Sequence, residues 1–183
     1  MSTFHSTTER LIEYWRSRAG DAPLPARTAI DPTDFAELLP RVFMLGRTQS
    51  GVYPLRLVGG FVGDLHGLDL RRRNALSLWA ERDRSGLQTA LEESRRRPEP
   101  LVALADLQSD AGAMAMEVLY APLAGPDGAA DRFLGLYQPL GLTARLRGGP
   151  ITAMSLRTLR RADGADEAAP RLRLATLHGR RIA

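Results

Sequence analysis

Apolar residues recur along the chain at two spacings, and each spacing predicts a different kind of element. Helical spacing is clearest over residues 6–19, where charged residues flank a narrow apolar face. Ser6 and Glu9 have the spacing of a capping box at the start of this helix, and Gly20 suits a left-handed residue at its end. The apolar face consists of Leu11, Ile12 and Trp15. The pattern therefore predicts an amphipathic N-terminal helix with both ends marked.

The stretch from residue 53 to residue 69 combines both spacings. Leu55 and Leu57 alternate with other residues at the period of two that gives a strand one buried face. Two consecutive glycines then break the strand, apolar residues follow at helical spacing over residues 61–65, and Gly67 ends the turn. A strand that leads into a short helix is a place where a sheet and its cover can enclose a cavity.

Further apolar runs predict the rest of a sheet and its helices. We expect strands over residues 41–47, 53–58, 101–107, 115–121 and 132–138, with a further candidate over 151–160. A short helix begins after Asp31 and ends at Pro40, and a longer one ends before Pro98. The longer helix has a buried face of Leu87, Leu91 and Ser94. Because the strands fall into hairpins on either side of a helical cluster, the order predicts a small antiparallel sheet of the α+β class.

The length suits one domain with appended segments. We expect residues 1–28 to form the N-terminal helix and a proline-rich connector, residues 29–161 the domain itself, and residues 162–183 a linker and a basic tail. No apolar run approaches the ~18 residues of a membrane span, and the N-terminus lacks the apolar core of a signal peptide. A cytoplasmic location is therefore expected.

Composition and charge exclude several kinds of chemistry. The sequence has no cysteine, which excludes disulfides, thiolate catalysis and a cysteine-linked flavin adduct. All 25 basic residues are arginine, and four of them lie within residues 171–183, which contain no acid. The preceding residues hold 21 arginines and 21 acids, so the net charge of +4 belongs to the tail. A neutral body argues against a nucleic-acid platform, which needs clustered positive charge.

Three segments together resemble a known family. They are LIEYWRSRAGDAPLPARTAIDPTDFAELLPRVFML, YPLRLVGGFVGDLHGLDL and MEVLYAPLAGPDGAADRFLGLYQPL. They are similar to the single-domain PAS family PAS_5, found mainly in alphaproteobacteria, over roughly residues 10 to 140. The resemblance implies a PAS-like antiparallel sheet with helices on one face, preceded by the N-terminal helix and followed by a C-terminal extension. It also implies a sensory or signalling role.

The resemblance places a set of residues on the elements that line a PAS pocket. They are Phe61, Leu65, Leu78, Trp79, Leu87, Leu91, Met116, Tyr120 and Tyr137. These side chains either enclose a small ligand, whose identity is unknown, or simply fill a core. His66 lies near the expected cavity wall and is a weak candidate for a haem ligand, with a hydrogen-bonded turn residue as the alternative. We predict no cofactor and no metal.

Catalysis is not expected, because no serine has a nucleophile-elbow context and the glycines lack the ending of a phosphate-binding loop. Asp106, Asp110 and Glu117 are the carboxylates that a hairpin can bring together, and Asp110 is better interpreted as a turn residue. The expected function is a sensory module that transmits through contact with a signalling partner. The alternatives are a constitutive adaptor with a filled core and, third, nucleic-acid binding through the arginine-rich tail.

A homodimer is also expected. The apolar face of the N-terminal helix can pack on its own domain or form a two-fold contact. We favour the dimer contact through Leu11, Ile12 and Trp15, because a short amphipathic helix ahead of a small sheet has little core to cover alone.

Overall fold

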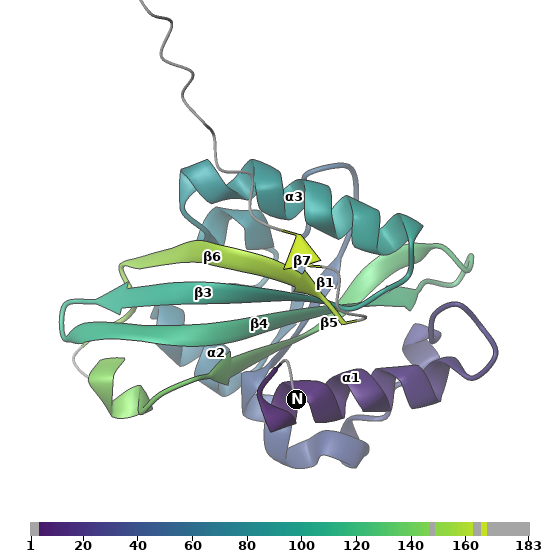
Figure 1. Ribbon diagram of the computed structural model, residues 1–183, viewed down its shortest axis with the longest axis horizontal. Helices are drawn as coiled ribbons and strands as arrows, with labels where there is room; N and C mark the ends of the chain where they lie inside the picture. The colour runs from purple at the N-terminus through teal and green to yellow at the C-terminus, as the bar shows by residue number, and fades with distance from the viewer. Residues whose placement is uncertain (1–3, 147–148, 163–165, 168–183) are drawn as a thin grey trace, which may run out of the picture.

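A seven-stranded antiparallel sheet forms the centre of the protein (Figure 1). The structure is a computed structural model that describes residues 4–146, 149–162 and 166–167. The strands are β1 (Val42–Gly46), β2 (Leu55–Val58), β3 (Leu101–Ser109), β4 (Gly112–Ala124), β5 (Ala130–Pro139), β6 (Ala153–Arg161) and β7 (Asp166–Glu167). Their order across the sheet is β2-β1-β5-β4-β3-β6-β7, so the first hairpin joins the later strands through the pair of β1 with β5.

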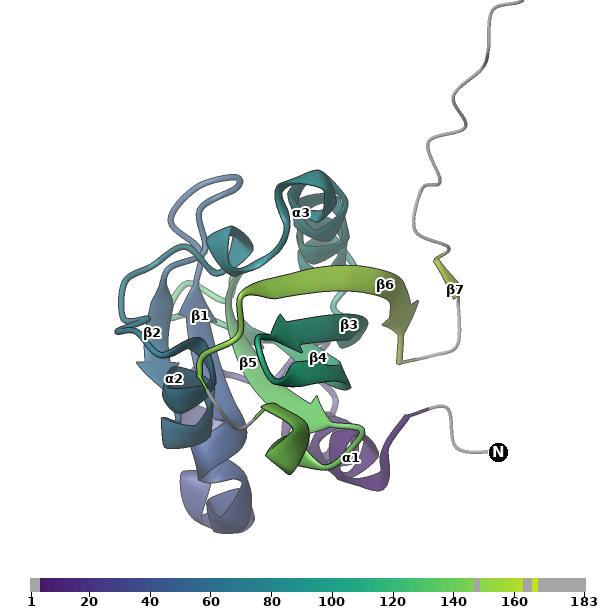
Figure 2. The same cartoon turned by 90° about the vertical axis from the view of Figure 1, so that its left-hand side faces the viewer.

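Helices cover both faces of this sheet. The α-helices are α1 (Ser6–Ala19), α2 (Gly60–His66) and α3 (Glu81–Arg96), and the 3-10 helices are η1 (Arg27–Ala29), η2 (Pro32–Arg41), η3 (Ala75–Leu78) and η4 (Thr143–Leu146). The face under α2, η3 and α3 is called the inner face, and the face under α1 and η2 the outer face. Figure 2 shows α3 above the sheet and α1 below it. Each face has its own apolar core, so the sheet is buried on both sides.

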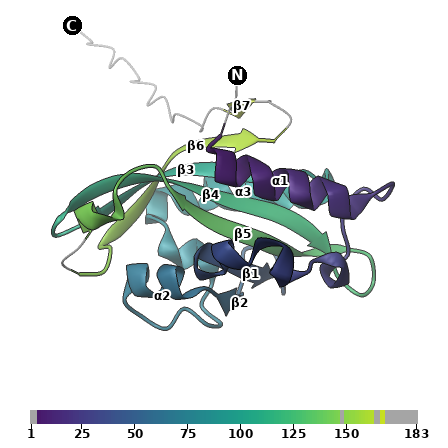
Figure 3. The ribbon, with the colours of Figure 1, turned by 90° about the horizontal axis from the view of Figure 1, so that it is seen from below.

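The N-terminal helix has the predicted bounds but a different cap and a different neighbour. His5, not Ser6, caps α1: its Nδ1 accepts a hydrogen bond from the Thr7 N–H at 3.1 Å. The helix packs on the outer face over β4 and β5, and Figure 3 shows it running roughly along these strands. Its three apolar residues, Leu11, Ile12 and Trp15, are only 1%, 3% and 5% exposed. The Trp15 indole N–H donates to the carbonyl of Pro122 in β4 at 2.6 Å.

The expectation that this apolar face forms a dimer contact is therefore wrong. Leu11, Ile12 and Trp15 share one core with residues of β1, β4 and β5 in the same chain. The sheet has an apolar outer face of its own, and α1 covers it. Burial within the protomer leaves these side chains no surface to offer a second copy.

The edge strand β2 also departs from its simple alternating pattern. Leu45 pairs with Leu55, whereas the adjacent residue Met44 pairs with Leu57, so β2 has an extra residue at this point. Such a β-bulge sends side chains two positions apart to opposite faces of the sheet. Leu55 is accordingly buried in the inner core, while Leu57 lies on the outer face and is 44% exposed. The predicted burial of both leucines on one face is wrong because the bulge changes the register.

The other predicted elements are present. The longer helix is α3, with Leu87, Leu91 and Ser94 buried as expected, and the candidate strand over 151–160 is β6. In the described residues, no helix is long and apolar enough to span a membrane. The basic tail lies outside the described residues, as does most of the linker, apart from Ala162 and the two residues of β7.

Candidate ligand pocket

The nine residues predicted to line a pocket meet on the inner face of the sheet. Leu65, Trp79, Leu87, Leu91, Met116, Tyr120 and Tyr137 are buried in one core, and Phe61 and Leu78 are partly buried against it. Residues from α2, η3 and α3 form the cover, while those from β4 and β5 form the floor. Side chains far apart in the sequence are thus brought to one place, as the resemblance implied.

Two polar pairs lie within this apolar region. The Trp79 indole N–H donates to the Tyr120 hydroxyl at 3.2 Å. The Tyr137 hydroxyl lies 3.1 Å from Nε2 of His66 and 3.8 Å from the sulfur of Met154. Buried polar groups need such partners, since an unsatisfied one costs about 1–3 kcal/mol. The helical cover and the sheet are therefore joined by hydrogen bonds as well as by apolar packing.

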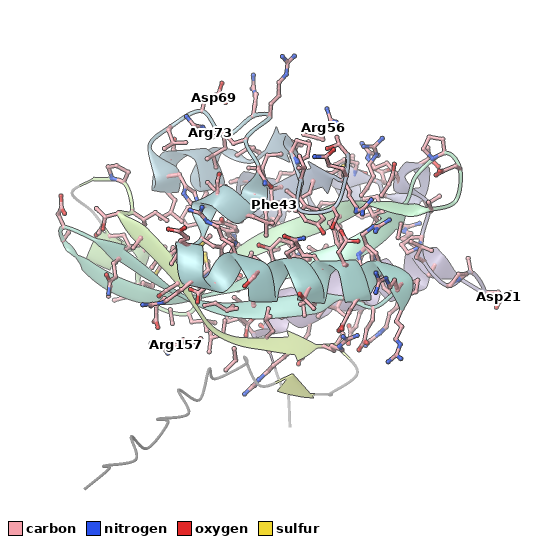
Figure 4. The ribbon with its side chains drawn as sticks, turned by 90° about the horizontal axis from the view of Figure 1, so that it is seen from above. Asp21, Phe43, Arg56, Asp69, Arg73 and Arg157 are labelled. Atoms are coloured by element: carbon pink, nitrogen blue, oxygen red, sulfur yellow. The ribbon has the colours of Figure 1, made fainter. Side chains whose placement is uncertain are left out.

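An aromatic residue that the sequence analysis missed lies between the two tyrosines. Phe43 of β1, which is labelled in Figure 4, packs edge-on against Tyr120 and Tyr137, with ring centroids 5.6 and 5.5 Å away. The ring has room because Gly135 lies opposite it in β5: a methyl group at Gly135 would lie 2.0 Å from the Phe43 ring. A glycine between large apolar residues in a predicted strand is the sequence signal for such a close approach.

Burial keeps the titratable groups of this site uncharged. It lowers the pKa of His66 to about 4, so the imidazole is neutral at pH 7. Burial also raises the pKa of Tyr120 and Tyr137, and both phenols stay protonated. The cluster therefore consists of neutral hydrogen-bonding groups surrounded by apolar side chains.

His66 occupies the end of α2 and is 7% exposed, with Nε2 directed at Tyr137. It is thus a buried, hydrogen-bonded side chain at the wall of the site. Among the described residues, no three histidine or carboxylate side chains gather as a metal site. The carboxylates considered for catalysis serve other contacts: Asp106 pairs with Arg157, and Glu117 accepts from the His5 N–H at 3.0 Å.

A surface hollow of about 650 Å³ lies on the other side of α2. It is lined by Val58, Gly59, Gly60, Gly63, Asp64, Gly67, Leu68, Asp69, Leu70 and Arg71. None of the nine predicted residues lines it. The hollow instead follows the solvent side of the helix whose buried side carries Leu65 and His66. This short, glycine-rich helix is the wall between solvent and the candidate pocket.

One protein-family model matches most of the chain. The model of the PAS_5 family, described as PAS domain, matches residues 3–138. Among solved structures, the chain is similar to the LOV protein of Rhodobacter sphaeroides, with 14% identity and a TM-score of 0.45, covering 61% of this chain and 69% of that one.

Two further structures are similar at the same level. An RNA-binding Light-Oxygen-Voltage receptor has 16% identity and a TM-score of 0.46, covering 64% of this chain and 35% of that chain. The EL346 blue-light activated histidine kinase of Erythrobacter litoralis has 19% identity and a TM-score of 0.44, covering 60% and 36%. No curated protein matches the chain.

Proposed function

Because this chain belongs to the PAS domain family, we propose that it is a sensory module that binds a small, largely uncharged ligand on the inner face and transmits through contact with another protein. In this proposal the chain has no catalytic activity of its own. The observation that carries it is the pair of buried polar contacts, Trp79 with Tyr120 and His66 with Tyr137, inside an otherwise apolar core.

These polar groups are more than packing requires. Replacing both partners of a buried hydrogen bond by apolar groups of the same shape is often nearly neutral for stability. Apolar side chains would therefore fill the same space, whereas the indole, imidazole and phenols add donors and acceptors that a ligand can use. A ligand that takes over one of these hydrogen bonds would change how α2 or η3 sits on the sheet.

A direct route connects the inner face to the outer one. Tyr120 points into the inner core from β4, and two residues later the Pro122 carbonyl accepts the hydrogen bond of Trp15 on α1. A change in β4 that accompanies ligand binding therefore reaches α1 through one strand. This supports an output surface on the outer side of the sheet.

Native mass spectrometry of freshly purified full-length protein, with a visible spectrum, tests the ligand. We expect a bound small molecule, and its retention should fall in the Tyr137→Phe variant. Tyr53→Phe is the matched control, since the Tyr53 hydroxyl pairs with Glu92 of α3 and not with the candidate pocket. Wild-type protein that binds no small molecule in this measurement, or in a thermal-shift screen, would contradict the sensor proposal.

The second candidate is a constitutive adaptor. It is favoured because the buried polar side chains already form hydrogen bonds with one another. Trp79, Tyr120 and Tyr137 are almost fully buried and already pair within the chain. An adaptor would capture its protein partner with the same affinity whatever small molecules are present, which separates it from a sensor.

A homodimer and a cytoplasmic location remain part of the proposal, and sedimentation and cell fractionation test them.

A further inference from the structure

Two arginine side chains share the space above a single glycine at one edge of the outer face. A methyl group at Gly46 of β1 would lie 3.0 Å from Nη1 of Arg132 and 3.0 Å from Nε of Arg56. The two nitrogens are therefore separated by at most twice that distance. Like charges held this close repel each other. An anion placed between them would remove the repulsion.

The sheet itself brings these arginines together. Arg132 is the residue of β5 that pairs with Gly46, and Arg56 occupies the bulge of β2. A third arginine, Arg27, donates from Nε to the sulfur of Met44, two positions before Gly46 and on the same face. The exposed Leu57 pairs across the strands with Met44. We call Arg27, Arg56, Leu57 and Arg132 the arginine face.

Little of the chain's own negative charge compensates this surface. Among the described residues, Arg27 and Arg56 have no carboxylate within ion-pair distance. Nε of Arg132 is 3.9 Å from the Asp131 carboxylate, longer than a charge-assisted hydrogen bond. At the opposite edge of the molecule, Arg157 of β6 pairs closely with Asp106 (Figure 4).

We propose that the arginine face docks an acidic segment of a protein partner, with a carboxylate bridging Arg56 and Arg132 and an apolar side chain packed on Leu57. Guanidinium groups suit this role, because each can present two parallel N–H donors to a carboxylate. This inference rests on the proposed function, for which it names the partner's chemistry and the output surface.

Other occupants fit less well. A second copy seated by two-fold symmetry would place arginine against arginine. The chain's own acidic pair, Asp166 and Glu167, is held in β7 at the far edge of the sheet from β2. Nucleic acid needs several clustered phosphate contacts, whereas this surface has three arginines around an exposed leucine. An acidic segment with an apolar residue matches both the charge and Leu57.

Fluorescence anisotropy with a labelled synthetic peptide of alternating glutamate and leucine tests the proposal on the full chain. We expect binding that weakens at least about tenfold in the Arg56→Gln, Arg132→Gln double variant, and that also weakens as salt rises from about 50 to about 200 mM. The matched control is Arg82→Gln, whose side chain is 80% exposed on α3 and should leave the affinity within about twofold. The same peptide with glutamine in place of glutamate should not bind.

The proposal would be overturned by a double variant that binds the peptide as tightly as the parent protein. It would also be overturned by a labelled single-stranded oligonucleotide that binds more tightly than the peptide and depends on the same two arginines. If the double variant melts early, Leu57→Glu replaces it, since an added carboxylate there should block docking without touching the core. Ligand retention in native mass spectrometry should be unchanged in each variant, so failure here is distinguishable from failure of the sensor proposal.

Discussion

Replacing Trp15 by alanine should remove much of the stability of this protein, because the indole joins α1 to the sheet. The side chain is 5% exposed, and its N–H donates to the Pro122 carbonyl at 2.6 Å. Truncating a buried tryptophan to alanine costs about 3–5 kcal/mol, and the carbonyl also loses its partner. We therefore expect a loss of about 4 kcal/mol from a total that is about 5–15 kcal/mol for an ordinary domain.

Urea unfolding followed by circular dichroism gives the free energy of unfolding of parent and variant. Leu142→Ala is the control, since that side chain is 73% exposed and its loss should change stability by less than about 0.5 kcal/mol. Trp15→Phe should fall between the two, because the ring stays while the hydrogen bond is lost. Sedimentation should give the same oligomeric state for all of them.

The reasoning would be refuted if Trp15→Ala lost less than about 1 kcal/mol, since no buried tryptophan anchor costs so little. If the variant kept its stability but dissociated from dimer to monomer, the result would support the two-fold contact that the sequence predicted for this helix.

Two further predictions concern the inner face. Gly135→Ala should destabilise the protein by about 1–3 kcal/mol or more, because its methyl group would overlap the Phe43 ring, and Phe43→Leu in the same chain should recover part of the loss in a melt. Lowering the pH from 6.5 toward 4 should reduce the free energy of unfolding by up to about 3 kcal/mol. Burial holds the pKa of His66 at about 4, so the unfolded chain binds more protons than the folded one between these two pH values. Above pH 6.5 this loss of stability is absent. A His66→Gln variant that kept the same pH dependence of unfolding would contradict the prediction.

The sequence by itself determined the elements and their buried faces where these depend on local spacing. The bounds of α1 match the predicted residues, and α3 buries the predicted stripe. Gly67 ends α2 in the left-handed conformation, with φ of 63°, as its position after the helical run indicated. Periodicity and end signals are properties of neighbouring residues, so they can be recognised without knowing what lies across the fold. The nine residues proposed for a pocket were chosen through the motifs of the family, and the structure places them in or against one core.

Only the tertiary structure decided which surface covers each buried face. The apolar face of α1 predicts burial either against a partner or against its own sheet. The apolar outer face of β4 and β5 decides between the two, because α1 packs on it. The bulge in β2 moved Leu57 into solvent, although its spacing from Leu55 predicted burial. The meeting of Phe43 with Gly135, and of Arg56 with Arg132, depends on how β1 aligns with strands distant in sequence. Long-range register sets these contacts, and local patterns do not encode it.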